Sequence, residues 1–330
     1  MENKIRIKWL QEVDSTNNVL LRHIRDYDNL SVVAAVSQTA GRGQRGNRWM
    51  SAPGDNLTFS LLLRPESLPA REVMAVTALA TLAVRDTLRG ENVEAVIKWP
   101  NDIYVGRRKI CGMLVENGLD GTDIDWSVIG IGINLNQTVF PVEVLNPTSL
   151  KRLTGRSYEL EPFLEKVCRQ IEALLPELDT PEGRKGLLEA YERDLFQKDS
   201  PAPYRDLASG KEFTGTILGI TPEGLLRVEA EGRERTFGFK EIGYILYPFR
   251  RASTAAAGSS ARNTALPATR MSTPAFFRRP AFLGETPPST SMRARLPIRL
   301  ISAFTARMRA YVSSMKDCPP KPAKTLIRST

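Results

Sequence analysis

The chain has 330 residues and a formal net charge of +9, with one histidine and three cysteines. This length allows two or three domains with a sizeable core. Three scattered cysteines are too few for a disulfide framework or a zinc cluster, and a single histidine excludes any site that needs two histidine ligands. The sequence contains no apolar run long enough to span a membrane and no signal-peptide segment at its start, so we expect a cytoplasmic protein without membrane contact.

The positive charge is concentrated at the C-terminal end. Residues 251–330 contain 14 Lys and Arg against two acidic residues, a net charge of +12, so residues 1–250 have a net charge of −3. The high pI is therefore no evidence that residues 1–250 bind DNA, and we expect that they do not. The same C-terminal stretch contains nine prolines and is rich in Ala, Ser, Thr and Arg. This composition predicts a disordered basic tail.

The first part of the chain is dominated by predicted strands. A helix is expected to begin near Ser15, where several capping residues precede an apolar repeat, and a longer one is expected over 71–89. The strands do not alternate with helices, which favours an α+β fold with a mixed, mostly antiparallel sheet. The strands are expected at 4–10, 32–36, 57–63, 93–98, 102–105, 109–116 and 126–135.

After residue 135 the pattern changes twice. Amphipathic helices are predicted at 160–175 and 186–196. Four short strands then follow, and such a series joined by turns is typical of a small SH3-like β-barrel. Their expected positions are 212–218, 224–228, 235–237 and 244–247. We therefore predict a catalytic domain over 1–200, a barrel over 201–250 and the tail over 251–330.

A glycine- and arginine-rich loop stands between two predicted strands. Its sequence, Gly-Arg-Gly-Gln-Arg-Gly at 41–46, follows Gln38 and precedes Trp49. Glycines allow close approach of the backbone to a ligand, and arginines supply donors for phosphate or carboxylate. The segment matches G-x-G-x-x-G, but a dinucleotide fingerprint needs a helix directly after it. A loop with Pro53 and Gly54 follows instead, so a Rossmann oxidoreductase is disfavoured.

Four further motifs accompany this loop, and each one alone is weak. Ser-Thr-Asn at 15–17 is by itself an ordinary helix cap. The others are Lys-Trp-Pro-Asn-Asp at 98–102, Lys-Ile-Cys-Gly-Met-Leu-Val-Glu at 109–116 and Gly-Ile-Gly-Ile-Asn at 130–134. Together, in this order, the five motifs resemble biotin protein ligases over about residues 1–248. The strand at 4–10 leads directly into Ser-Thr-Asn, so the chain resembles the monofunctional group without an N-terminal DNA-binding domain.

The resemblance implies a catalytic domain like that of class II synthetases. It implies an ATP- and Mg²⁺-dependent ligase that activates biotin as biotinyl-5'-AMP and transfers it to a lysine. The implied acceptor is the biotin carboxyl carrier protein of acetyl-CoA carboxylase or a similar biotin enzyme, and AMP and diphosphate are released. A weak homodimer is left open by this interpretation.

The residues agree with this chemistry independently. A carboxylate must attack the α-phosphate of ATP, and because both reactants are anions the site must be cationic. Positive charge is available from Arg42, Arg45, Lys98 and Lys109, while Asp102 and Asn134 are candidate ligands for Mg²⁺ or the nucleotide. The sequence has no P-loop, so ATP must be held by another device.

The resemblance also assigns roles to single residues. Arg42 and Lys109 are the expected catalytic residues, with Lys109 on the biotin carboxyl oxygen or the α-phosphate. Trp49 is expected to form a wall beside the bicyclic ring. The expected contacts at the ureido head of biotin are Ser15, Thr16, Asn17 and Gln38. Those that close over the carboxyl end and the adenylate phosphate are Arg42, Gly43 and Gln44. Arg45 and Gly112 are also expected to contact biotin or its adenylate. Trp99 and Cys111 are expected to be buried core residues.

Three alternatives or departures remain at this point. A lipoate–protein ligase is the nearest alternative, because it shares the general fold. A nucleic-acid binder acting through the basic tail is an alternative of another class. Many family members carry arginine where this chain has Gln44, so the loop would hold the adenylate with less charge there. We expect the reaction to be retained, because Arg42 and Arg45 remain.

Overall fold

The computed structural model describes residues 4–246 of the chain, except for the side chain of Arg45. The predicted disordered basic tail over 251–330 lies outside the described residues, as does the last residue of the strand predicted at 244–247. Within the described part, no helix has both the length and the apolar character that crossing a bilayer would require.

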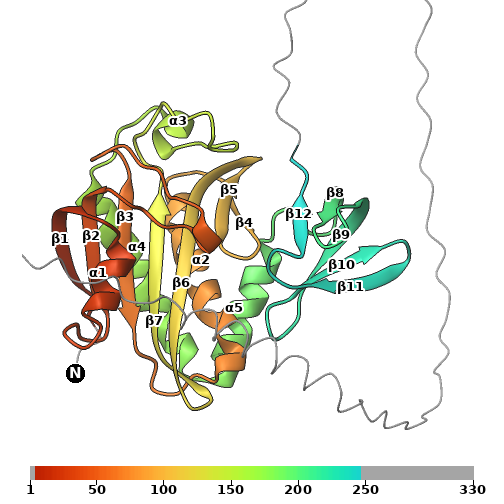
Figure 1. Ribbon diagram of the computed structural model, residues 1–330, viewed down its shortest axis with the longest axis horizontal. Helices are drawn as coiled ribbons and strands as arrows, with labels where there is room; N and C mark the ends of the chain where they lie inside the picture. The colour runs from red at the N-terminus through yellow and green to blue at the C-terminus, as the bar shows by residue number, and fades with distance from the viewer. Residues whose placement is uncertain (1–3, 247–330) are drawn as a thin grey trace, which may run out of the picture. The chain divides into compact units, whose positions relative to one another are not determined.

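A seven-stranded sheet forms the larger part of the described structure (Figure 1). The strand order is β1-β2-β3-β7-β6-β5-β4, and only β1 and β2 run parallel. The predicted mixed, mostly antiparallel α+β fold is therefore confirmed. The strands are β1 (Arg6–Val13), β2 (Ser31–Gln38), β3 (Leu57–Leu63), β4 (Ala95–Lys98), β5 (Asp102–Val105), β6 (Arg108–Asp120) and β7 (Asp123–Ile133).

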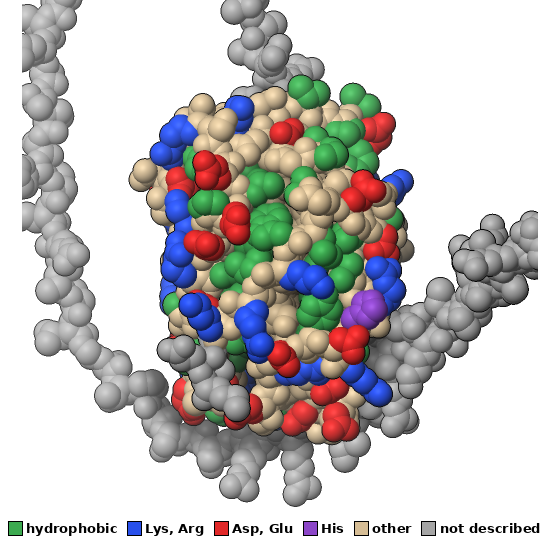
Figure 2. All heavy atoms as spheres, turned by 90° about the vertical axis from the view of Figure 1, so that its left-hand side faces the viewer, with side chains coloured by type: hydrophobic (Ala, Val, Ile, Leu, Met, Phe, Trp, Pro, Cys, Tyr) green, Lys and Arg blue, Asp and Glu red, His purple; other side chains and the backbone are tan. Residues whose placement is uncertain are grey.

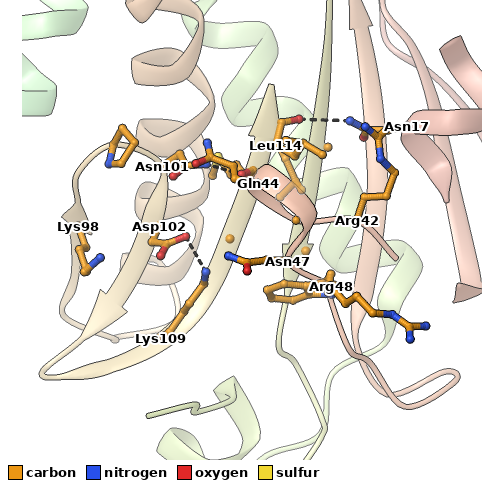
Figure 3. Close-up of a pocket in the computed structure, with 18 of the residues that line it drawn as sticks. Asn17, Arg42, Gln44, Asn47, Arg48, Lys98, Asn101, Asp102, Lys109 and Leu114 are labelled. Carbon is orange, nitrogen blue, oxygen red and sulfur yellow. Dashed lines mark hydrogen bonds and ion pairs between the residues drawn. The ribbon is translucent and has the colours of Figure 1, made fainter. Parts of the chain in front are cut away.

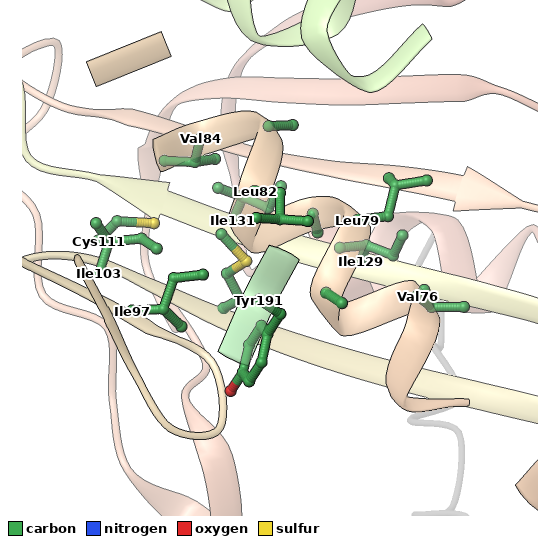
Figure 4. Close-up of a cluster of buried hydrophobic side chains, with 14 of the residues drawn as sticks. Val76, Leu79, Leu82, Val84, Ile97, Ile103, Cys111, Ile129, Ile131 and Tyr191 are labelled. Carbon is green, nitrogen blue, oxygen red and sulfur yellow. The ribbon is translucent and has the colours of Figure 1, made fainter. Parts of the chain in front are cut away.

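Five α-helices accompany the two sheets of the described part. They are α1 (Thr16–Arg22), α2 (Met74–Arg89), α3 (Leu150–Thr154), α4 (Leu160–Leu174) and α5 (Pro181–Arg193). The apolar positions of α2 recur at helical spacing and are almost all buried, so this helix is the centre of the core. Its side chains Val76, Leu79 and Leu82 lie over β7, beside Ile129 and Ile131 (Figure 4).

The two faces of β7 carry different kinds of residue. Ile129, Ile131 and Ile133 are buried in the core. Side chains alternate across a strand, so Gly130 and Gly132 lie on the opposite face. Their neighbours in register are Ser60 and Thr58 of β3, and Leu114 and Gly112 of β6. Apart from Leu114, the centre of the sheet therefore presents small or absent side chains on the face away from α2.

The second sheet is wholly antiparallel, with the strand order β11-β10-β9-β8-β12. Its strands are β8 (Pro201–Asp206), β9 (Glu212–Ile220), β10 (Leu226–Ala230), β11 (Arg233–Phe237) and β12 (Ile242–Tyr244). Our prediction missed β8, because prolines at 201 and 203 normally interrupt a strand. They are tolerated here because β12 pairs with β8 only from Tyr204 onward.

Charged side chains of both signs are interspersed around hydrophobic ones on the face of the molecule that carries β1 (Figure 2). This mixture agrees with the small net charge of residues 1–250. The single histidine, His23, is exposed and lies 3.2 Å from a carboxylate oxygen of Asp26. It belongs to the surface of the protein, as expected.

Candidate functional site

A cavity of about 310 Å³ lies on the glycine face of the large sheet (Figure 3). Segments far apart in the sequence line it: the start of α1, the loop after β2, the turn between β4 and β5, strands β6 and β7, and the end of the second sheet. Most residues singled out from the sequence meet here. They are Ser15, Thr16, Asn17, Gln38, Arg42, Gly43, Gln44, Trp49, Lys98, Asp102, Lys109 and Gly112.

One of the expected residues is not part of this assembly, and another has no described side chain. The side chain of Arg45 lies outside the described structure. The Asn134 amide is buried and donates a 2.9 Å hydrogen bond to the carbonyl of Thr148, and Asn134 does not line the cavity. The structure therefore does not bring Asn134 together with Asp102 as the expected pair of metal or nucleotide ligands. Its amide instead secures the chain that follows β7.

Hydroxyl and amide groups form a connected network at one end of the cavity. Ser15 is the N-cap of α1, and the backbone N–H of Thr16 donates to the Gln38 side-chain oxygen at 2.8 Å. The Ser60 hydroxyl lies 2.7 Å from the Thr16 hydroxyl and 2.6 Å from the Asn17 amide oxygen. Sequence reasoning missed Ser60, which stands inside an apolar run. A hydroxyl in such a run gives no local signal, and only the structure shows that every position of this strand is buried.

The position of Asn17 depends on the absence of a side chain at Gly130. A Cβ atom at Gly130 would lie 2.1 Å from the Asn17 amide oxygen, which is far inside van der Waals contact. The Asn17 amide nitrogen donates to a carboxylate oxygen of Glu116 at 2.8 Å and to the Leu114 carbonyl at 3.3 Å. Asn17 is therefore held between α1 and the floor of the cavity.

The loop after β2 is folded back on itself. The backbone N–H of Gly43 donates to the Asn47 carbonyl at 2.7 Å, and that of Trp49 donates to the Gly41 carbonyl at 3.0 Å. A short 3₁₀ turn, Gln44–Gly46, forms the tip, where Gly46 has a φ of +83°. No α-helix follows before β3. The loop therefore lacks the helix of a dinucleotide-binding fingerprint, as predicted.

Trp49 closes this loop against the sheet. Its indole ring packs over Gly112 and Gly132, and a Cβ atom at Gly132 would lie 2.3 Å from a ring carbon. The Lys109 ammonium is 6.0 Å from the ring centroid. The indole forms one wall of the cavity, and only glycine leaves room for it.

Two of the expected cations are already paired with carboxylates. The Arg42 guanidinium donates to both carboxylate oxygens of Glu116, at 2.8 and 3.0 Å, and to the side-chain oxygen of Asn18 at 2.9 Å. The Lys109 ammonium lies 2.7 Å from a carboxylate oxygen of Asp102 (Figure 3). Glu116 closes one of the sequence motifs, but we had not assigned it to the site.

Lys98 lies in an aromatic environment. Its ammonium is 4.4 Å from the ring centroid of Tyr244 and 5.5 Å from that of Tyr104, which are cation–π distances. Burial lowers the pKa of Lys98 below its usual value. The charge of Asp102 opposes this shift, and that of Lys109 adds to it.

Trp99 and Cys111 are buried, as predicted. The Trp99 indole N–H donates to the Gly224 carbonyl at 3.0 Å, which connects the turn after β4 to the second sheet. Burial raises the pKa of the Cys111 thiol far above its usual value, so it is not a thiolate nucleophile at neutral pH.

Comparison with known proteins agrees with this geometry. Residues 9–134 match the model of the biotin/lipoate A/B protein ligase family. The bifunctional ligase/repressor BirA of Escherichia coli K12 is 32% identical over 226 residues, which are 68% of this chain and 69% of that protein. The chain belongs to the biotin/lipoate A/B protein ligase family.

Two further proteins show that the chain is similar to biotin protein ligases in particular. A biotin--[acetyl-CoA-carboxylase] ligase of Paracoccus denitrificans is 31% identical over 177 residues, covering 52% of this chain and 73% of that enzyme. The structure of the Aquifex aeolicus biotin protein ligase in complex with biotin and ATP has a TM-score of 0.59 and 26% identity, over 72% of this chain and 97% of that one. The resemblance to biotin protein ligases is therefore confirmed.

The packing of Trp49 on Gly132 leads to a first prediction. In Gly132→Ala the new methyl group occupies the place of the indole, so Trp49 must leave the sheet. We expect the ¹⁹F resonance of 5-fluorotryptophan at position 49, assigned with Trp49→Phe, to move in this variant. Gly186→Ala is the matched control, since nothing lies within 4 Å of a Cβ atom at that position of α5. An unchanged resonance in Gly132→Ala would contradict the packing.

Proposed function

We propose that this chain joins biotin to ATP as biotinyl-5'-AMP and transfers the biotinyl group to a lysine of a biotin carboxyl carrier protein, such as that of acetyl-CoA carboxylase. The proposal rests on one observation, a single cavity whose two ends differ in chemistry. Hydroxyl and amide groups gather around Asn17 at one end, and Lys98 and Lys109 lie at the other. A biotin molecule offers a polar ureido head and an anionic carboxylate, which fit these two ends.

The ureido head needs donors and acceptors held in fixed positions. We assign this function to Ser15, Thr16, Asn17 and Gln38, with Ser60 supporting them from below. Hydrogen bonds among Thr16, Asn17, Gln38 and Ser60 fix the orientation of these groups before ligand arrives. Trp49 and the glycine floor then provide the apolar surface that a bicyclic ring system requires.

The activation step brings two anions together. The biotin carboxylate oxygen attacks the α-phosphorus, and diphosphate leaves. We assign the stabilisation of the developing charge to Arg42 and Lys109, assisted by Lys98 and by the backbone N–H groups of Gln44 and Arg45. These groups act as fixed donors, so little reorganisation is needed during the reaction.

Mg²⁺ fits this site only together with a nucleotide. The described residues contain no cluster of three His, Cys, Asp or Glu side chains that would hold a metal ion alone. Asp102 is the carboxylate that lines the cavity, and Mg²⁺ commonly binds one carboxylate together with substrate phosphates. When bound, the ion would neutralise phosphate charge, with Asp102 as its protein ligand.

The transfer step needs no nucleophile from this chain. The adenylate is a mixed anhydride, so the amine of the acceptor lysine attacks its carbonyl carbon and AMP leaves. The protein positions the two reactants and keeps water away from the anhydride. The buried thiol of Cys111 takes no part in this step.

We also infer the domain division from these contacts. Residues 1–200 carry the large sheet and most of the cavity, and the second sheet within 201–250 is interpreted as an SH3-like barrel. Leu207, Ile242 and Tyr244 of this sheet line the cavity, so the barrel contributes to the site. Residues 251–330 carry no part of the proposed chemistry.

The decisive assay uses the full chain with biotin, ATP, Mg²⁺ and an apo carrier domain. We expect biotin to become attached to the carrier in an ATP-dependent manner, detected by mass spectrometry. We also expect ATP–pyrophosphate exchange with biotin but not with lipoate. Exchange with lipoate alone would replace the proposal by a lipoate ligase. Activity that persists after removal of residues 251–330 would exclude a requirement for the tail.

Lys109→Ala tests the cationic end of the site. Removal of one preorganised donor to a reacting oxyanion typically costs about 100-fold or more in rate. We therefore expect the rate of adenylate formation to fall by about that factor. The rate is measured as pyrophosphate exchange at saturating biotin and ATP. Lys185→Ala on the surface of α5 is the control, since that side chain is 78% exposed. A rate equal to that of wild type would remove Lys109 from the mechanism.

Gln44→Arg tests the departure of this chain from many family members. An arginine would add a charge-assisted donor at the tip of the loop, where the adenylate phosphate is expected. We expect the variant to release biotinyl-adenylate more slowly into solution in the absence of carrier. The measurement is a filter assay of free and bound [¹⁴C]biotinyl-adenylate, and equal release rates would mean that position 44 has no role in retention.

A further inference from the structure

Glu116 connects two segments that line the cavity, the first turn of α1 and the loop after β2. It lies on β6, on the same face as Leu114 and Gly112, and its side chain is 16% exposed. One carboxylate oxygen accepts a hydrogen bond from Arg42, in the loop after β2. The other accepts from both Arg42 and Asn17, the latter in the first turn of α1.

We propose that Glu116 is a positioning residue for biotin, which sets the Arg42 guanidinium and the Asn17 amide in one fixed relation. This inference rests on the proposed function, because it concerns the same site. Its consequence is that the roles proposed for Asn17, at the ureido head, and for Arg42, at the carboxylate, are not independent. A change at Glu116 alters both, although Glu116 itself need not touch the ligand.

The number of donors explains why this position needs a carboxylate. Three N–H groups, two from Arg42 and one from Asn17, converge on two oxygens. A glutamine amide has one oxygen and one N–H₂ group. In either orientation the amide N–H₂ would face at least one of the three donors. Glutamine has nearly the same shape but cannot serve both partners at once.

The loop that carries Arg42 does little by itself to fix the position of the guanidinium. Arg42 stands between two glycines, Gly41 and Gly43, and its side chain is 38% exposed. Without Glu116 the guanidinium retains the single hydrogen bond to Asn18 and can turn into solvent. A ligand would then have to order the arginine when it binds, which lowers affinity.

The Arg42–Glu116 pair does not saturate the arginine. A guanidinium has five N–H donors in a fixed fork. The bonds to Glu116 and Asn18 occupy three of them and leave donors for a ligand oxygen. The pair is therefore compatible with a direct contact between Arg42 and the biotin carboxylate.

The test is biotin binding by isothermal titration calorimetry in the absence of ATP. For Glu116→Gln we expect the dissociation constant to rise about tenfold, the size expected for a lost charge-assisted hydrogen bond. The KM for ATP should change less than about twofold. Arg42→Ala should weaken biotin binding similarly, and the double variant should be no weaker than the worse single variant, because both changes remove the same coupled arrangement.

Glu234→Gln is the matched control. Glu234 on β11 makes the same kind of two-point contact with Arg227 on β10, away from the cavity. Its loss should leave biotin binding unchanged. A purely structural role for Glu116 would lower the melting temperature without changing the dissociation constant of the folded fraction.

The results of these experiments can overturn the proposed role of Glu116. Wild-type affinity in Glu116→Gln, or strictly additive effects of the Glu116 and Arg42 changes, overturns it. If Glu116→Gln does not fold, Glu116→Asp keeps the charge but is one methylene too short for both partners, and full affinity in that variant overturns the inference equally. If the wild-type chain itself does not bind biotin, the proposed function fails first, so the two failures are distinguishable.

Discussion

The close approach of side chains to the centre of the large sheet depends on the missing Cβ atoms at Gly112, Gly130 and Gly132. Trp49 ring atoms stand where a Cβ atom of Gly132 would be, and the Asn17 amide stands where that of Gly130 would be. A Cβ atom at Gly112 would lie 2.9 Å from the end of the Lys109 side chain. The isoleucines that alternate with the glycines of β7 fill the core against α2. One strand thus builds the hydrophobic core with one face and the floor of the site with the other.

Carboxylates on the strands beneath the cavity explain how the cations of the site can be accommodated before anionic substrates bind. Arg42 and Lys109 each lie against a carboxylate, Glu116 and Asp102, on neighbouring strands of the sheet. Partly buried charges without partners would be costly, so each pair keeps its cation from being left unpartnered and also orients it. A bound anion then competes with, or adds to, a carboxylate that is already in place. The site is preorganised because its charges are balanced internally.

The secondary-structure elements that depend on local sequence patterns could be predicted from the sequence. Alternating and continuous apolar runs located nearly all strands of the large sheet, and capping residues located the start of α1. Ser60 could not be assigned, because a buried hydroxyl within an apolar run has no local signal. Glu116 and Arg42 are 74 positions apart in the sequence, so their contact could not be read from a local pattern. The prediction for Asn134 failed because its amide donates to the Thr148 carbonyl, in the chain after β7. Such contacts are fixed only by the tertiary fold.

The turn between β4 and β5 shows how the second sheet contributes to the cavity. This turn carries Lys98 and Asp102, and contacts from outside the large sheet hold it at several points. The Tyr191 hydroxyl of α5 donates to the Pro100 carbonyl at 2.8 Å, and the Trp99 indole donates to Gly224 of the second sheet. Tyr244 of β12 covers the Lys98 ammonium. Because Tyr244 lies at a cation–π distance from this ammonium, a residue beyond position 200 contributes to the surroundings of the charge at this end of the cavity. The C-terminal sheet is therefore part of the electrostatic environment of the site as well as a neighbour of the catalytic fold.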